Sequence, residues 1–235
     1  MQKQHLNIQG IPAVLWGPPS AQLYIAVHGD QSHKEDTVLR MLAETAATKG
    51  YQTLSFDLPE HGGRKGEPRL CNPQNGVADL AQIFDYARTC ADNLYLFGCS
   101  IGAYFSMLAY QNEPLTQALF LSPILDLQRV VNNMMTQFDI SEQRLKQAQK
   151  IVTPAKTLYW KDYQYITNHP VAWKLPTELL YGTNDFFCEP DCIHRFSEGG
   201  QVNITVMEGG EHYFHTETQL AFFQEWLDAC IPVSL

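Results

Sequence analysis

The sequence is poor in positive charge. Of its 235 residues, 16 are Lys or Arg and 25 are Asp or Glu, which gives a net charge of −9. Proteins that bind nucleic acid use Lys and Arg to displace counterions from phosphate groups. The acidic balance therefore argues against a nucleic-acid partner and favours a neutral or weakly polar small molecule as the ligand.

Long apolar runs are also missing. A membrane-spanning helix takes about 20 consecutive apolar residues, and no stretch of the sequence approaches that length. The first 20 residues, MQKQHLNIQGIPAVLWGPPS, show no basic start followed by an apolar run and a small-residue cleavage site. We therefore expect a cytoplasmic protein without a membrane span.

The six cysteines do not form the dense pattern of a small domain that depends on disulfides. Cys188, Cys192 and His194 form a C-x3-C-x-H spacing, for which zinc ligation is one interpretation. Judged against known zinc spacings, free thiols are the favoured interpretation. We accordingly expect no metal and no cofactor.

The sequence does contain a repeated alternation of β-rich and helical runs. Apolar runs bounded by turn residues predict strands, and apolar residues at helical spacing predict helices. The expected strands are 23–29, 51–57, 93–98, 117–123, 177–182 and 203–208, and the expected helices are 37–50, 77–90, 101–110 and 216–230. Such alternation predicts an α/β fold, with a mostly parallel central sheet and helices on both faces. An antiparallel hairpin that turns at Gly10 precedes it.

The alternation is interrupted between about residues 126 and 175. The strand before this segment ends at Ser122–Pro123 and the next begins after Pro176. The segment therefore predicts a short cap insertion after the sixth strand, within a single domain of residues 1–235. Seven large side chains in it are candidates to line an apolar substrate pocket, although ordinary packing would also explain each of them: Met134, Met135, Phe138, Tyr159, Trp160, Tyr163 and Trp173.

The stretch LYLFGCSIGAY, residues 94–104, places a thiol and a hydroxyl side by side. Residues 98–102 fit G-x-S-x-G between an expected strand and an expected helix, the context in which the serine hydroxyl projects from the sheet on a strained turn. Ser100 is thus the candidate nucleophile. Successive strand side chains point to opposite faces, so Cys99 is expected to be a buried apolar filler with little thiolate character.

A serine hydroxyl is a weak nucleophile unless a base takes its proton and a third group orients the base. In the G-x-S-x-G context the acid and then the histidine follow along the chain, each at the end of a strand. Asp185 in LLYGTNDFF and His212 in VMEGGEHYF meet this order. Other residues remain candidates for these two roles: His215 for the base, and Asp126 or Asp191 for the acid.

The same context places an oxyanion hole at two backbone N–H groups, one from Ile101 and one from the loop VHGDQSHK. In that loop the N–H after Gly29 belongs to Asp30. A carboxylate beside a developing anion is unfavourable, so we expect the Asp30 side chain to turn away or to be paired. His28 is expected to be a structural hydrogen-bonding residue rather than a base.

Together these motifs resemble those of the α/β-hydrolase fold superfamily, in particular its branch of small carboxylesterases, monoacylglycerol-lipase-like and cinnamoyl-esterase-like proteins. The motifs are H-G (28–29), D-L-P-x-H-G (57–62), G-C-S-I-G (98–102), G-T-N-D (182–185) and G-x-x-H (209–212). The resemblance implies a serine hydrolase that cleaves a small to medium carboxylic ester, or a thioester, through an acyl-enzyme. It also implies that Ser100 attacks, His212 shuttles the proton and Asp185 orients His212.

The chain departs from this pattern at three positions that border the site. Proteins of this superfamily often have an aromatic or small apolar residue where this chain has Asp30. They also often show D-x-x-G-H-G-x-S, whereas this chain has Glu60 in place of the first glycine and Arg64 in place of the serine. Substrate choice therefore stays open. Two other functions also remain: amide or peptide cleavage, as in serine aminopeptidases, and non-catalytic ligand binding on the same fold. The sequence does not predict the oligomeric state.

Overall fold

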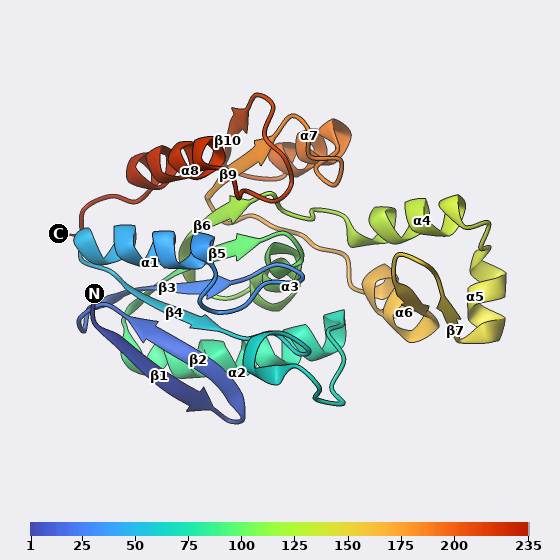
Figure 1. Ribbon diagram of the computed structural model, residues 1–235, viewed down its shortest axis with the longest axis horizontal. Coiled ribbons are helices and arrows are strands. Elements are labelled where there is room, and N and C mark those ends of the chain that lie inside the picture. Colours follow the sequence, from blue (N-terminus) through green and yellow to red (C-terminus); the bar gives the residue numbers. More distant parts are fainter. Residues whose placement is uncertain (235) are drawn as a thin grey trace.

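The computed structural model describes residues 1–234, and an eight-stranded sheet runs through it in the order β1-β2-β4-β3-β5-β6-β9-β10 (Figure 1). The hairpin β1–β2 is antiparallel and joins β4 antiparallel, whereas every pair from β4 to β10 is parallel. The strands are β1 Lys3–Ile8, β2 Ile11–Trp16, β3 Gln22–Val27, β4 Gln52–Phe56, β5 Asn93–Cys99, β6 Leu115–Leu121, β9 Thr177–Gly182 and β10 Val202–Met207. The predicted mostly parallel sheet is confirmed.

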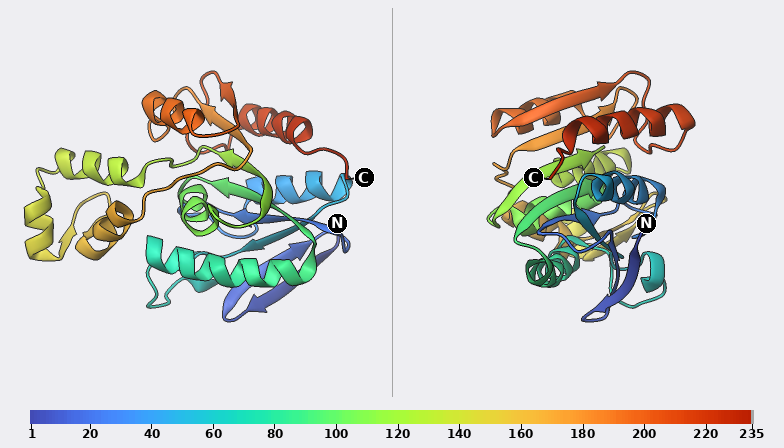
Figure 2. Two further views of the ribbon diagram at one scale, coloured as in Figure 1. Left: turned by 180° about the vertical axis from the view of Figure 1, so that it is seen from behind. Right: turned by 90° about the vertical axis from the view of Figure 1, so that its left-hand side faces the viewer.

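Helices cover both faces of the sheet (Figure 2). Helices α1, Thr37–Thr48, and α8, Glu217–Cys230, pack on one face, and α2, Pro73–Cys90, and α3, Ile101–Tyr110, pack on the other. Alternate residues of β3 show the division, because Ile25 belongs to the core under α2 and α3 and Ala26 to the core under α1 and α8. Strands buried on both faces read as continuous apolar runs, which is why the sequence predicts them well.

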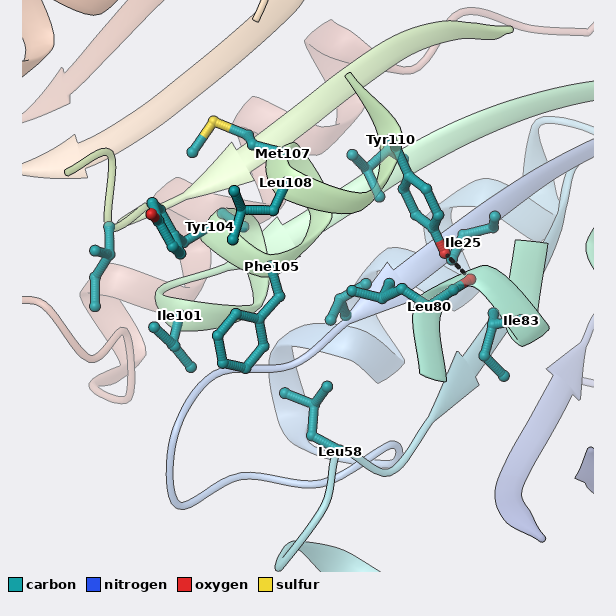
Figure 3. Close-up of a cluster of buried hydrophobic side chains, with 14 of the residues drawn as sticks. Ile25, Leu58, Leu80, Ile83, Ile101, Tyr104, Phe105, Met107, Leu108 and Tyr110 are labelled. Carbon is teal, nitrogen blue, oxygen red and sulfur yellow. Dashed lines mark hydrogen bonds between the residues drawn. The ribbon is translucent and has the colours of Figure 1, made fainter. Parts of the chain in front are cut away.

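The core beneath α2 and α3 fixes the helix that begins just after Ser100 (Figure 3). Every residue of α3 except Ala109 is buried. Tyr110 donates a hydrogen bond from its hydroxyl to the carbonyl of Leu80 on α2, at 2.7 Å. The two helices also approach closely, because a Cβ at Gly76 would lie 2.6 Å from the ring of Phe105. Close packing of this kind leaves the N-terminus of α3 little freedom to move.

Between β6 and β9 the chain leaves the sheet and forms an insert, residues 122–176, that stands at one side of it (Figure 1). The insert contains α4 Leu127–Gln137, α5 Glu142–Ala148, the hairpin of β7 Lys150–Val152 and β8 Thr157–Tyr159, and α6 Trp160–Asn168. An insertion after the sixth strand was predicted, but α4 and the hairpin were not. The Asp126 carboxylate starts α4 by accepting a hydrogen bond from the backbone N–H of Arg129, at 2.8 Å.

Two shorter elements complete the fold, η1 Gly62–Arg64 and α7 Pro190–Glu198. Helix α7 was not predicted, and it contains two residues of the C-x3-C-x-H stretch. Across residues 1–234, no helix combines the length and the apolar character that crossing a membrane requires.

Candidate active site

Ser100 lies on a strained turn between β5 and α3. Its φ is 52° and its ψ is −122°, a conformation that side chains rarely adopt. The glycines two residues away on either side make the turn possible. A Cβ at Gly98 would lie 2.7 Å from the Cα of Ala103, and a Cβ at Gly102 would lie 2.2 Å from the carbonyl oxygen of His28. The turn has the geometry that the G-x-S-x-G pattern predicts.

Three side chains form a continuous hydrogen-bonded series at this turn. Ser100 Oγ lies 2.8 Å from His212 Nε2, and His212 Nδ1 lies 2.8 Å from Asp185 Oδ2. A carboxylate only accepts hydrogen bonds, so Nδ1 carries the proton and donates it to Asp185. In the neutral ring, Nε2 then holds a lone pair that faces the Ser100 hydroxyl.

The loops after β9 and β10 bring the two partners of Ser100 together. A Cβ at Gly182 would lie 2.1 Å from the carbonyl carbon of Gly210, so the two loops pack backbone against backbone. Asp185 is buried, which alone would raise its pKa, but hydrogen bonds from His212 and from the backbone of the following loop hold the pKa below its usual value. The carboxylate is therefore ionised and able to orient the imidazole.

The alternative residues for these two roles lie elsewhere. His215 is exposed, and its Nδ1 contacts the carbonyl oxygen of Tyr213 at 2.8 Å. Asp126 caps α4, and Asp191 is an exposed residue in the first turn of α7. The hydrogen-bonded series from Ser100 thus runs through His212 and Asp185 and through none of these.

The loop after β3 lies against Ser100, since a Cβ at Gly29 would be 3.0 Å from the Ser100 Cβ. His28 is fully buried, with Nδ1 2.7 Å from the Gly29 carbonyl oxygen and Nε2 accepting from the N–H of Leu58 at 3.0 Å. Burial lowers the pKa of His28 to about 4, so the ring is neutral and structural, as predicted. The Asp30 carboxylate is paired, with Oδ1 3.2 Å from His61 Nε2.

No protein-family model and no curated protein matches the sequence. Solved structures match nearly the whole chain. Alpha/beta hydrolase domain-containing protein 10 from mouse is 14% identical, with 97% of this chain and 98% of that chain covered and a TM-score of 0.78. This chain has the α/β-hydrolase fold.

Two further structures with this fold are similar to the chain. Est1E from Butyrivibrio proteoclasticus, with ferulic acid bound, is 19% identical, with 96% of each chain covered and a TM-score of 0.74. A monoacylglycerol lipase from Paleococcus ferrophilus is 18% identical, with 93% of this chain and 98% of that chain covered and a TM-score of 0.64. At these identities the likeness establishes the fold and not the substrate.

In this α/β-hydrolase-fold chain, Ser100 and His212 open into a cavity of about 700 Å³ between the sheet and the insert. The wall on the side of the sheet is mostly apolar, with Ile101, Phe105, Leu121 and Phe187. Three carboxylates, Asp30, Asp36 and Asp162, and one amine, Lys156, also border it. A cavity of this size accommodates a drug-sized molecule.

Helix α4 contributes one stripe of side chains to the cavity. Leu127, Val130, Val131 and Met134 line it, at the i, i+3, i+4, i+7 spacing of one helix face. Sequence reasoning missed the first three, although that spacing is visible in the sequence. Met135 and Phe138 do not line the cavity: Met135 is buried in the large hydrophobic cluster beneath α2 and α3, and Phe138 is partly buried and packs against that cluster.

Of the other four aromatic candidates in the insert, Tyr159 and Tyr163 line the cavity and the two tryptophans do not. The ammonium group of Lys146, from α5, lies 5.7 Å from the centre of the Trp160 ring. Trp173 donates its indole N–H to the Thr177 hydroxyl at 2.8 Å. Both rings are buried in packing contacts, so the prediction that they line the pocket is wrong.

Cys99 differs from its prediction in one respect. It is only partly buried, and it borders the cavity instead of being packed wholly away from it. Burial, together with the nearby carboxylates Asp36 and Asp185, raises the pKa of the Cys99 thiol to about 12. The group is therefore a neutral thiol and a poor nucleophile near neutral pH, as predicted.

The C-x3-C-x-H stretch does not gather into a metal site. Cys188 and Cys192 are buried free thiols, whereas His194 is exposed and faces Glu198 at 3.3 Å. Within residues 1–234, the one group of possible metal ligands is Asp185, Cys188 and His212. The His212–Asp185 hydrogen bond already occupies this group, and burial raises the pKa of the Cys188 thiol. A metal there would have to displace that hydrogen bond.

Proposed function

We propose that this protein is a serine hydrolase that cleaves a small to medium carboxylic ester, or a thioester, through an acyl-enzyme intermediate. The observation that carries the proposal is the series Ser100–His212–Asp185, with 2.8 Å at each contact, at the wall of an apolar cavity. The similarity of the whole chain to a monoacylglycerol lipase structure and to Est1E with ferulic acid bound supports ester chemistry.

In this mechanism Ser100 Oγ attacks the ester carbonyl carbon while its proton passes to His212 Nε2. The tetrahedral intermediate collapses when the bond to the alcohol oxygen breaks and His212 returns the proton to that oxygen. Water then attacks the acyl carbonyl and gives one proton to His212, and the acid leaves as His212 passes that same proton to Ser100 Oγ. Asp185 stays ionised throughout and stabilises the imidazolium.

Two backbone N–H groups would stabilise the negative oxygen of the tetrahedral intermediate. Ile101 is the first residue of α3, and the first N–H groups of a helix have no partner within it. The second N–H belongs to Asp30. The carbonyl of the Gly29–Asp30 peptide contacts His28, so the N–H of that trans peptide points the opposite way. The pairing of Asp30 with His61 offsets the carboxylate charge near this position.

The insert would act as a cap that binds the apolar part of the substrate. Its stripe on α4, with Tyr163 and Ile166 of α6, faces the wall that contains Phe105. An acyl group or an apolar alcohol fits such a lining, whereas an anionic substrate would meet three carboxylates and only one amine. We therefore expect an ester without negative charge.

The proposed function is tested with a panel of substrates. The panel contains p-nitrophenyl esters from acetate to decanoate, methyl ferulate, a monoacylglycerol, acyl thioesters and matched p-nitroanilides. Hydrolysis of esters that is lost in Ser100→Ala supports the proposal. Faster turnover of anilides than of esters would indicate an amidase, and no turnover of any member would favour a binding protein.

Replacing Cys99 with Ala is expected to leave kcat/KM for the best ester within about threefold of wild type. The reason is that its thiol is protonated at neutral pH and is absent from the series that activates Ser100. Steady-state kinetics of Cys99→Ala beside Cys71→Ala, another partly buried cysteine that borders the cavity, checks this. A loss specific to Cys99→Ala of more than about tenfold would assign the thiol a part in the reaction.

Replacing Val131 with Trp is expected to narrow the cavity beside α4. The larger ring should lower kcat/KM for the octanoate ester by at least about tenfold and leave the acetate ester nearly unchanged, because a few methylenes are worth about that much in an apolar pocket. Asn132→Trp is the matched control, because Asn132 is next to Val131 but is exposed and does not line the cavity. If the two variants changed the chain-length preference equally, the insert would not be part of the substrate-binding site.

A further inference from the structure

His61 lies behind the loop that carries the second candidate oxyanion N–H. It comes from the segment between β4 and η1, and it is buried with 7% exposure. Its Nδ1 lies 2.7 Å from the carbonyl oxygen of Pro59. A carbonyl only accepts, so Nδ1 carries a proton in every state of the ring. The centre of the ring lies 5.2 Å from that of the buried His28 ring.

The other nitrogen of His61 faces two groups of the Asp30–Gln31 turn. Nε2 is 3.0 Å from the backbone nitrogen of Gln31 and 3.2 Å from Asp30 Oδ1. A neutral ring accepts from the Gln31 N–H, and a protonated ring donates to the Asp30 carboxylate. The imidazole therefore bonds this turn in both protonation states.

The turn needs such support because its backbone is strained. Gln31 has a φ of 58°, a left-handed conformation that a residue with a side chain adopts only when its surroundings hold it there. His28 fixes the peptide before Asp30 through the Gly29 carbonyl, and His61 contacts the peptide after it. His28 thus holds the backbone before the residue whose N–H would face the developing oxyanion, and His61 holds either the peptide after that residue or its side chain, according to the protonation state of the ring.

We propose that His61 is a positioning residue, which fixes the Asp30–Gln31 turn so that the Asp30 N–H is aimed at the transition-state oxygen. The inference rests on the proposed function. It also explains why an acidic residue is tolerated beside the oxyanion hole, because the carboxylate is turned toward His61 and serves as one of its two contacts. Asp30 and His61 thus act together to fix the turn.

The charges around the ring are consistent with an ion pair. Burial lowers the pKa of His61, but the hydrogen bond with Asp30 and the nearby Cys71 outweigh it and raise the pKa to about 10. In return, the hydrogen bond from His61 lowers the pKa of Asp30 to about 2. At neutral pH the protonated ring therefore holds the turn through the Asp30 carboxylate, and the hydrogen bond from the Gln31 N–H forms only when the ring is neutral.

Three variants test the proposal with the best ester of the panel and with a trifluoromethyl ketone, which places an oxyanion in the hole when it adds to Ser100. His61→Phe removes both ring nitrogens. We expect it to lower kcat by about 100-fold, the range for the loss of one oxyanion donor, to weaken ketone binding by the same factor, and to leave KM within about threefold. A merely structural role would instead lower thermal stability without coupling kcat to ketone affinity.

His61→Gln keeps one polar atom near the position of Nε2 but does not titrate. We expect it to restore part of the loss, with kcat and ketone affinity each about 5- to 20-fold below wild type. His33→Phe is the matched control, because His33 is an exposed histidine of the same loop region that does not line the cavity. It should match wild type in all three measurements.

Folded His61→Phe with wild-type kcat and ketone affinity would overturn the proposal. If His61→Phe does not fold, His61→Gln decides, and wild-type values in that variant would overturn it in the same way. These outcomes differ from failure of the proposed function, in which wild-type protein itself would hydrolyse no ester and bind no ketone.

Discussion

Ser100→Ala is expected to lower kcat for ester hydrolysis by about 10⁴-fold or more, the size of effect that follows removal of a serine nucleophile. Without Oγ no acyl-enzyme can form, and the oxyanion donors and the cavity alone give only a small residual rate. Binding should survive, because the cavity lining and the His212–Asp185 bond do not depend on the hydroxyl. The measurement is kcat and KM on the best p-nitrophenyl ester, with product-analogue binding by calorimetry.

Ser106→Ala is the matched control for this variant. Ser106 is a fully buried serine of α3, the helix that begins just after Ser100, and its hydroxyl donates to the Gly102 carbonyl at 2.7 Å. It lies outside the cavity lining, so its loss should alter kcat by less than about threefold. If Ser106→Ala and Ser100→Ala lost activity to the same extent, the effect would be one of helix stability and not of chemistry.

Asp185→Asn is expected to lower kcat by about 10⁴-fold at neutral pH while KM changes little. The asparagine amide is isosteric and can still accept the hydrogen bond from the backbone N–H of Phe187, which Asp185 Oδ1 accepts at 2.9 Å. Its NH₂ group, however, would donate to His212 Nδ1 and favour the tautomer with the proton on Nε2. Nε2 would then be unable to take the proton of Ser100.

The control for Asp185→Asn is Asp191→Asn, at an exposed acid on α7 that the sequence left as an alternative. It should retain wild-type kcat. A wild-type rate in Asp185→Asn would show that His212 needs no acid to orient it. Loss of rate in Asp191→Asn would show that the acid role had been assigned to the wrong carboxylate.

Much of the sheet and of the site could be predicted because each rests on local sequence. Parallel strands buried on both faces give apolar runs such as 23–29, whatever their partners are. The turn at Ser100 follows from two glycines, each of which meets a neighbouring backbone too closely for a Cβ. The order of Asp185 and His212 along the chain then leaves few alternatives.

The lining of the cavity could not be predicted in the same way, because it depends on helix rotation. Met134 lines the cavity and its neighbour Met135 is buried in the large hydrophobic cluster, although the two side chains are alike in size and chemistry. Trp173 is equally apolar, but a hydrogen bond to Thr177 turns it to the packing beside β9. Composition identifies an apolar segment, and only tertiary contacts decide which face of it meets the substrate.

The contact between Asp30 and His61 is a second feature that could not be predicted from the sequence. The two residues are 31 positions apart, and each lies in an irregular loop. Local pattern predicts that an acid beside an oxyanion hole must be paired, since a free carboxylate there opposes the anion. It does not identify the partner, because loop conformation and not periodicity brings the imidazole to the turn.

The central claim is that Ser100 is a nucleophile activated by His212, and reaction with a fluorophosphonate tests it most directly. The protein is treated with the probe and digested, and the modified peptide is identified by mass spectrometry. We predict a single adduct on Ser100, abolished in Ser100→Ala, slowed by about 10³-fold or more in His212→Ala, and unchanged in Cys99→Ala. No adduct on the wild-type protein, or an adduct that persists in Ser100→Ala, would contradict the account.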